Sequence, residues 1–460
     1  MSYGMKDLLE IEKNLFEIEK MDINPYSGGL FTYVYETGDK NLRDIQHKAL
    51  NIFYDRNALD FTTFRSAAFF EKEIVSFAKA LSHAQENVLG TLTYGGTESI
   101  LLAVKSARDF FRKNKGADTV PELIIPSSAH PSWEKAAEYF DLKLKIVPID
   151  RETKKVDLES LKNSINEKTA LVVGSAPNFP FGSIDPIHDM GEITKEKSVL
   201  LHVDACVGGF ILPFFEQLGE KVPVYDFREE AVTSISMDVH KYGYALKGSS
   251  VLLFQNPEMK KYSNYVNISW PSYIFVNTSI LSSRSVGPMA SAWAAINFLG
   301  MDGYLNLTKK VLSARDFIYN EMSKLGFRST SPIESSILSL YNNDIDIFNF
   351  VVNMHKRSWY IEIQKSIPEL VPYNLHMTLT PIHDDLSKPF IKDVKETLKL
   401  PKDKEFSALM EDISSGNLDN ISRMVKEGTL NTVMLIKLLE LIPEDFAKEA
   451  ANQLVNEMFK

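Results

Sequence analysis

The stretch Ser234-Ile235-Ser236-Met237-Asp238-Val239-His240-Lys241-Tyr242-Gly243-Tyr244 decides how this chain folds and where its chemistry lies. Residues 231–235 form a β-branched run, which predicts a buried strand. A polar turn with a His-Lys pair follows that strand. A lysine that a rigid strand delivers to the edge of a sheet can form a Schiff base with an aldehyde. Taken alone, such a pair is more typical of an ordinary surface, so other residues must support the interpretation.

The bulk composition indicates a soluble enzyme-sized protein. The chain has 460 residues, 44% of them hydrophobic, which is enough for one large domain and one or two smaller ones. Acids outnumber bases 61 to 51, and the net charge of −10 argues against a general nucleic-acid binder. The single cysteine, Cys206, excludes an internal disulfide framework and a cysteine-rich metal site. No signal peptide and no membrane-spanning run is found, so we expect no transmembrane segment and a cytoplasmic location.

Apolar strands alternate with helices from residue 122 onward. Strands are predicted at 123–126, 142–147, 170–174, 199–204, 231–235 and 250–254, with helices at 133–140, 158–165 and 187–195. This alternation predicts an α/β fold, with a large, mostly parallel sheet covered by helices on both faces. Ligands of such sheets bind at the carboxyl ends of the strands. His130, Asp204 and Lys241 all fall at such ends.

The pattern changes after residue 256 and predicts a smaller C-terminal α+β domain. Helices are expected at 288–298, 305–325, 345–354 and 391–398, strands at 336–340 and 375–379, and charged amphipathic helices from 406 on. At the other end, residues 6–20 read as an amphipathic helix of a kind that often packs on a partner subunit. We therefore divide the chain into an N-terminal arm and flap (1–55), a large domain (56–300) and a small domain (301–460).

A glycine-rich stretch at 91–99 precedes a helix predicted at 100–112. Its glycines, including Gly96, allow backbone N–H groups to approach a ligand closely, and a helix N-terminus attracts phosphate. Thr97 is expected to cap the helix and to contact that phosphate. Alone, the motif is equally well explained as a glycine turn with a helix cap.

These elements together match the needs of one cofactor, pyridoxal phosphate. Lys241 would hold its aldehyde, and Asp204 would keep the pyridine nitrogen protonated so that the ring accepts electrons. His130 would stack on the ring, and Gly96 with Thr97 would hold the phosphate. Each residue alone has an ordinary structural explanation, but the set, in this order and at strand or helix ends, favours the cofactor.

On these residues the chain resembles the group II pyridoxal phosphate-dependent decarboxylases, which are fold-type I enzymes, and within that family it is most similar to the sphingosine-1-phosphate lyases. The matching motifs lie at 95–99, 129–140, 174–180, 182–186, 202–210, 226–228 and 234–250. The resemblance extends from about residue 25 to 400.

The resemblance implies further site residues and a reaction. It implies that His240, and Ser283 from a partner subunit, also bind the cofactor phosphate. It places Asn57, Lys247 and Tyr33, or a neighbour of this tyrosine, at the substrate. It also implies a homodimer with shared active sites and a retro-aldol cleavage of a phosphorylated long-chain base to a fatty aldehyde and phosphoethanolamine.

The chain departs from the family pattern at its substrate end, and this leaves alternatives open. Asp60 stands where the family has a phosphate-binding histidine, and Ile436 stands where a tyrosine is expected. A carbon–carbon lyase is favoured by the cation of Lys247. An amino-acid decarboxylase with the same cofactor is favoured by Asp60. A non-catalytic binding protein is the third hypothesis, and the presence of both Lys241 and Asp204 argues against it.

Overall fold

The computed structural model describes residues 6–414, 433, 436–437 and 444–458. Its centre is a seven-stranded sheet in the order β1-β7-β6-β5-β4-β2-β3. The strands are β1 (Leu89–Thr93), β2 (Glu122–Pro126), β3 (Lys143–Val147), β4 (Thr169–Ser175), β5 (Leu200–Asp204), β6 (Val232–Met237) and β7 (Ser250–Phe254). Only β7 runs antiparallel to its neighbours in this sheet, so the predicted mostly parallel sheet is confirmed.

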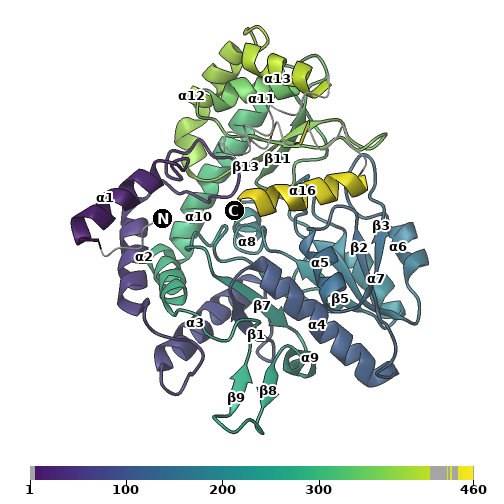
Figure 1. Cartoon of the computed structure of the whole chain (residues 1–460). Coiled ribbons are helices and arrows are strands. Elements are labelled where there is room, and N and C mark those ends of the chain that lie inside the picture. Colours follow the sequence, from purple (N-terminus) through teal and green to yellow (C-terminus); the bar gives the residue numbers. More distant parts are fainter. Residues whose placement is uncertain (1–5, 415–432, 434–435, 438–443, 459–460) are drawn as a thin grey trace.

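Helices cover both faces of this sheet (Figure 1). They are α3 (Arg65–Leu81), α4 (Gly96–Lys115), α5 (Ser132–Tyr139), α6 (Leu158–Ser164), α7 (Ile187–Glu196), α8 (Leu212–Gln217) and α9 (Pro257–Lys261). The position of β4 between helices on both faces of the sheet explains why its sequence is apolar throughout. Val172 packs into the core on one face, whereas Leu171 and Val173 pack into the core on the other.

A second, four-stranded antiparallel sheet of order β10-β11-β13-β12 forms the smaller C-terminal part. Its strands are β10 (Arg328–Ser329), β11 (Ile337–Tyr341), β12 (Glu362–Gln364) and β13 (Asn374–Thr378), and its helices are α11 (Ile347–His355), α12 (Ile382–Thr397), α13 (Lys404–Ser414) and α16 (Glu444–Met458). The smaller α+β unit is therefore present. The parts of the predicted tail helices at 415–432 and 438–443 lie outside the described residues.

Helix α10 (Gly287–Lys324) contains the two helices that were predicted separately at 288–298 and 305–325. They meet at Gly300, which has a φ of 55° and interrupts the helical backbone. Only glycine adopts this left-handed region without strain, so the change of direction is encoded at that position. The domain boundary that we predicted at residue 300 stays a prediction.

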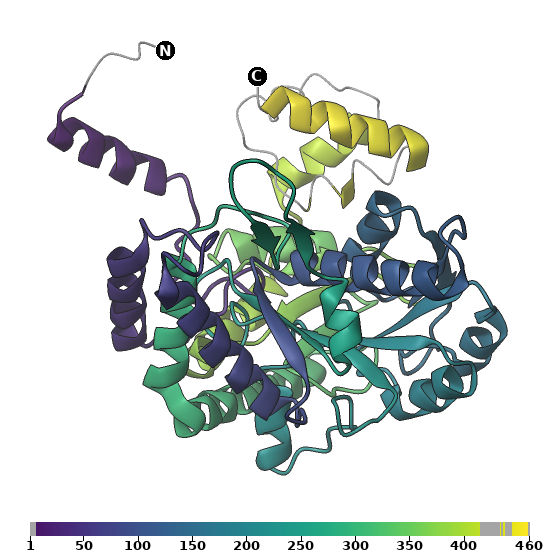
Figure 2. The same ribbon diagram turned by 90° about the horizontal axis from the view of Figure 1, so that it is seen from below.

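The N-terminal segments pack less closely. Helix α1 (Leu8–Glu19) buries none of its residues and stands away from the body, whereas α2 (Lys40–Phe53) packs on α10 (Figure 2). A hairpin of β8 (Tyr265–Asn267) and β9 (Phe275–Asn277) projects beside β1 and α9 (Figure 1). This hairpin was not predicted from the sequence. Within the described part of the chain, no helix combines the length and the apolar character that crossing a membrane requires.

Candidate active site

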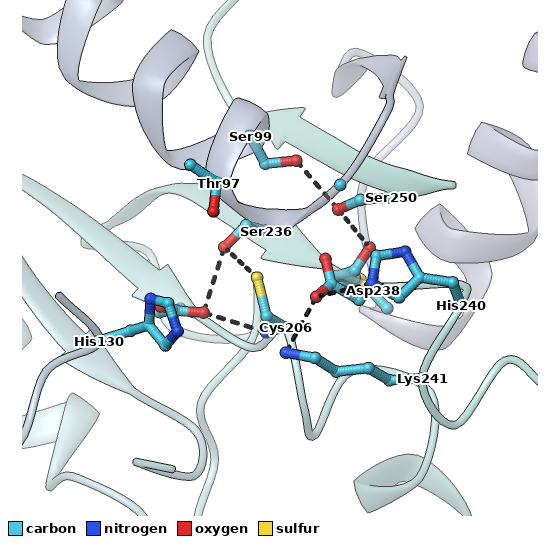
Figure 3. Close-up of polar contacts among 12 residues, drawn as sticks. Thr97, Ser99, His130, Cys206, Ser236, Asp238, His240, Lys241 and Ser250 are labelled. Atoms are coloured by element: carbon cyan, nitrogen blue, oxygen red, sulfur yellow. Dashed lines mark hydrogen bonds and ion pairs between the residues drawn. The ribbon is translucent and has the colours of Figure 1, made fainter. Parts of the chain in front are cut away.

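A cavity of about 290 Å³ opens at the carboxyl ends of β4, β5 and β6. The register of these strands places Asp204 between Ser175 and Ser236, so side chains far apart in the sequence meet at one edge. Six of the predicted cofactor residues line the cavity: Gly96, Thr97, His130, Asp204, His240 and Lys241. Its volume is near the lower end of the roughly 300–1,000 Å³ that is typical of small-molecule sites. Figure 3 shows four of them: Thr97, His130, His240 and Lys241.

Lys241 lies in this cavity as part of an ion pair. Its Nζ is 3.0 Å from Oδ2 of Asp238, whose side chain is only 2% exposed (Figure 3). Burial alone would raise the pKa of Asp238, but the charges of Lys241 and His240 outweigh burial and hold this pKa at about 2. Burial alone would likewise lower the pKa of Lys241, but the carboxylate of Asp238 raises it above the usual value. The sequence analysis did not recognise Asp238 as a functional residue.

Asp204 is fixed at the end of β5 by three donors. The indole Nε1 of Trp133 donates to Oδ2 at 3.0 Å, whereas the backbone N–H of Cys206 and the hydroxyl of Ser236 donate to Oδ1 at 3.1 and 3.5 Å. Trp133 is fully buried and makes an edge-on contact with His202, with 4.9 Å between the ring centroids. Oδ2 accepts only the indole N–H among the described residues, so it can still accept a hydrogen bond from a proton-bearing ligand nitrogen. We did not foresee Trp133, because nothing in its local sequence points to Asp204.

The N-terminus of α4 forms one wall of the cavity. A Cβ on Gly96 would lie 2.8 and 2.9 Å from the two carboxylate oxygens of Asp238, so only glycine fits here. The hydroxyl of Ser99 shares hydrogen bonds with Thr93 at 2.7 Å and with Ser250 at 3.0 Å, which anchors the first turn of the helix on β1 and β7. The helix is 20 residues long, so its first N–H groups present a full dipole to the cavity.

The predicted capping role of Thr97 is wrong. The N-cap of α4 is Gly95, with extended backbone and no side-chain cap, and Thr97 is the second residue of the helix. The helix starts at Gly96, four residues earlier than predicted. Gly95 forms the turn before the helix, and Gly96 is already the first helical residue. The Thr97 hydroxyl instead shares a hydrogen bond of 2.9 Å with Ser132, at the start of α5. Thr97 still lines the cavity, so its predicted contact with a phosphate stays a prediction.

Two histidines, His130 and His240, line the cavity. The Nδ1 of His240 is buried and has no hydrogen-bond partner among the described residues, which is costly unless a ligand satisfies it. The ring of His130 accepts a hydrogen bond from the backbone N–H of Ser132 through Nδ1. Burial, opposed by the carboxylate of Asp204, lowers the pKa of His130, so its ring is neutral near pH 7.

Lys247 and Tyr35 lie next to Lys241. The ammonium of Lys247 is 5.3 Å from the ring centre of Tyr35 and 3.4 Å from the backbone oxygen of His240. Surrounding protein atoms, together with the charge of Lys241, lower the pKa of Lys247 to about 8. Burial raises the pKa of Tyr35 to about 12, although Lys241 acts in the opposite direction. We predicted that Tyr33 or a neighbouring residue would lie at the substrate. Tyr35 is such a neighbour, and its ring faces Lys247.

Tyr33 itself lies elsewhere. It is 68% exposed and lines a second cavity of about 270 Å³, together with Glu362, Tyr360 and Ile436. Tyr33 has a φ of 67°, in the left-handed region, so the chain turns between the two tyrosines. Tyr33 therefore lies beside Ile436, one of the two departures from the family pattern. It does not line the cavity that contains Lys241.

Asn57 and Ser283 do not line the cavity but contact each other. The amide of Asn57 donates to the Ser283 hydroxyl at 3.4 Å, and both the N–H of Arg284 and that of Leu59 donate to the Asn57 side chain. Ser283 is exposed. Asp60 is also exposed, and its carboxylate accepts hydrogen bonds from the hydroxyl and N–H groups of the next threonines in the same turn. These bonds lower the pKa of Asp60 to about 2 and give this departure a local structural role.

The residues present fit pyridoxal phosphate. The unsatisfied Nδ1 of His240 and the helix N-terminus at Gly96 suit a phosphate. The anchored carboxylate of Asp204 suits a protonated ring nitrogen, and the amine of Lys241 suits an aldehyde. The neutral ring of His130 is available to stack on the pyridine. The donor set therefore supplies all four contacts that the cofactor needs, within one cavity.

Comparisons with known proteins agree with this cofactor. Residues 71–327 match the pyridoxal-dependent decarboxylase conserved domain. A sphingosine-1-phosphate lyase of Oryza sativa subsp. japonica is 36% identical over 401 residues, which cover 85% of this chain and 73% of that protein. A solved sphingosine-1-phosphate lyase of Burkholderia pseudomallei aligns with a TM-score of 0.82 and 29% identity, over 90% of this chain and 96% of that one. A glutamate decarboxylase of Lactobacillus brevis, at 19% identity, shares the fold with a TM-score of 0.76, over 86% and 93% of the two chains.

Proposed function

The chain belongs to the pyridoxal-dependent decarboxylase family, and from that premise we propose that it is a carbon–carbon lyase acting on a phosphorylated long-chain base of the sphingosine 1-phosphate type. The cofactor is pyridoxal phosphate, as the family implies. The observation that carries the substrate assignment is the ammonium of Lys247, which lies beside Lys241 and forms no ion pair within the described ranges. An unpaired cation next to the lysine of the cofactor suits a substrate with a phosphate beyond its amine.

The bound cofactor would supply an electron-withdrawing ring that lets a bond at the carbon beside the substrate amine break. Asp204 would hold a proton at the ring nitrogen, and Trp133 with the N–H of Cys206 keeps its carboxylate in place. His130 would cover one face of the ring. Gly96 and His240 would bind the phosphate.

Two proton carriers lie where the substrate amine and hydroxyl would be held. Lys241 Nζ is kept protonated by Asp238, so it is a proton donor for the carbon beside the amine. Tyr35, with a pKa of about 12, keeps its phenolic proton at neutral pH and can donate it or relay it. Lys247 binds the distal phosphate, and half of its charge is lost at about pH 8, which is its pKa.

We further propose that the protein works as a homodimer. Ser283 and Asn57 are held together outside the cavity of their own chain, which is where a residue that serves a second copy would lie. The hairpin β8–β9 and the loop around it also expose many apolar side chains: Tyr265, Val266, Ile268, Trp270, Tyr273, Ile274 and Val276. A contiguous exposed apolar patch marks an interface. Sedimentation velocity tests the homodimer, since a monomer at micromolar concentration would contradict it.

The cytoplasmic location stays a prediction.

Product analysis by mass spectrometry tests the reaction. The cofactor-loaded protein is incubated with sphingosine 1-phosphate and, separately, with a panel of amino acids, and Lys241→Ala serves as the control. A long-chain aldehyde together with phosphoethanolamine, absent in the control, is the expected result. Carbon dioxide and an amine from an amino acid would instead establish a decarboxylase. No product from either, with normal cofactor absorption, would refute both assignments.

A further inference from the structure

Glu98 occupies an unusual position for a carboxylate. It lies in the first turn of α4, directly after Gly96 and Thr97, yet it is only 8% exposed and does not line the cavity. A negative side chain at a helix N-terminus competes with a bound phosphate for the same N–H groups and dipole. The position of its carboxylate therefore bears on how well α4 can hold the cofactor phosphate.

Three backbone N–H groups outside the helix turn the Glu98 carboxylate away from the cavity. Oε2 accepts from the N–H of Tyr94, in the turn that joins β1 to α4. Oε1 accepts from the N–H groups of Ile280 and Leu281, which follow β9 and are 182 and 183 residues away in the sequence. Glu98 thus connects the phosphate-binding end of α4 with the loop 278–284.

The far end of that loop is attached to the same part of the sheet. The guanidinium of Arg284 donates to the backbone oxygen of Leu92 at 2.7 Å and lies 3.5 Å from the carboxylate of Glu71. Glu71 in turn accepts from the N–H of Leu92 at 3.1 Å. Ser283 lies between the two attachments, and it is exposed. The loop is therefore held at both ends against β1 and its turn, with Ser283 presented outward.

We propose that Glu98 is a positioning residue that couples phosphate binding at the N-terminus of α4 to the order of the loop 278–284. When the loop is in place, its N–H groups take up the charge of Glu98 and leave the helix N–H groups for the phosphate. When the phosphate is bound, its repulsion favours the same outward position of Glu98 and so stabilises the loop. Such coupling is reciprocal. The inference rests on the proposed placement of the cofactor phosphate at Gly96 and Thr97, but not on the substrate.

Amide hydrogen exchange on the full chain tests the coupling, with and without pyridoxal phosphate. In the wild-type protein, peptides that cover 278–284 should exchange more slowly when the cofactor is bound. Glu98→Gln keeps the size of the side chain but has one acceptor oxygen, so it loses the bond to Tyr94 or those to the loop. We expect this variant to lose the cofactor-dependent protection of the loop and to bind the cofactor about ten-fold more weakly, which corresponds to about 1.4 kcal/mol.

A second variant of Glu98 and a control variant distinguish the effect of the length of the Glu98 side chain from the effect of its charge. Glu98→Asp retains the charge but cannot reach the loop, so it should weaken cofactor binding more than Glu98→Gln does. Glu134→Gln removes an exposed carboxylate from the first turn of α5 and should change neither measurement. The proposal is overturned if the wild-type loop shows no cofactor-dependent protection, or if Glu98→Gln keeps both that protection and wild-type affinity. Neither readout uses substrate, so a failed product assay would leave the outcome interpretable.

Discussion

Asp238→Asn is the most direct test of the site's electrostatics, because it removes the charge that faces Lys241 and keeps the size of the side chain. The pKa of Asp238 falls from 3.8 to about 2 in the folded protein. At 1.36 kcal/mol for each pKa unit, this difference is worth about 2 kcal/mol of stability. Since the folded-state pKa is depressed, the contribution is complete above about pH 4 and is lost as the pH falls towards 2.

The first assay is urea unfolding of the cofactor-free protein. At pH 7 the variant should be about 2 kcal/mol less stable than the wild type, and the difference should shrink between pH 4 and pH 2. Breaking a buried ion pair can cost roughly 3–5 kcal/mol. The smaller value applies here because the side chain of Lys241 is 21% exposed and can lose its proton.

The second assay follows the capture of pyridoxal phosphate by its change in absorption in stopped flow. The amine of Lys241 must be neutral to attack an aldehyde, and Asp238 raises its pKa. In Asp238→Asn burial dominates, so the pH profile of capture should move to lower pH. Asp204→Asn is the matched control, because Asp204 lies in the same cavity but is not among the main groups that shift the pKa of Lys241. An unchanged pH profile in Asp238→Asn would refute the assigned ion pair.

Three further outcomes follow from the same geometry. Gly96→Ala should weaken cofactor binding at least ten-fold in equilibrium titrations, because its Cβ would lie 2.8 Å from a carboxylate oxygen of Asp238. Gly95→Ala is the control. Its Cβ would meet nothing closer than 3.6 Å, so this variant should bind the cofactor nearly as well as the wild type. Lys247→Ala should raise KM for a phosphorylated substrate while leaving the absorption of the bound cofactor unchanged; in the wild type KM should rise as the pH passes about 8, since the lysine then loses its charge. A lost cofactor spectrum would mean that Lys247 is misplaced. Trp133→Phe removes one donor to the carboxylate at the ring nitrogen and should lower the stability of the cofactor-free protein by about 1–3 kcal/mol in urea unfolding; unchanged stability would show that this bond contributes nothing.

Local sequence predicted most of the large sheet. Apolar runs such as 170–174 predict strands that are buried on both faces, and the structure places β4 there. The positions of His130, Asp204 and Lys241 near the cavity follow from one rule, that the carboxyl ends of parallel strands share an edge. The first residue of α4 was harder to predict, because either of two consecutive glycines can belong to the turn or to the helix.

The sequence by itself determined the fold class and the cofactor and predicted the lysine that would hold it, because these depend on periodicity and on residues that follow strands directly. Tertiary structure decided how those residues are supported. Trp133 reaches Asp204 across 71 residues of sequence, and no local pattern encodes a contact between two elements of the fold. It also decided which tyrosine faces the lysine. Tyr33 and Tyr35 would point to the same side of an extended strand, but the left-handed backbone at Tyr33 turns only the second one towards Lys241.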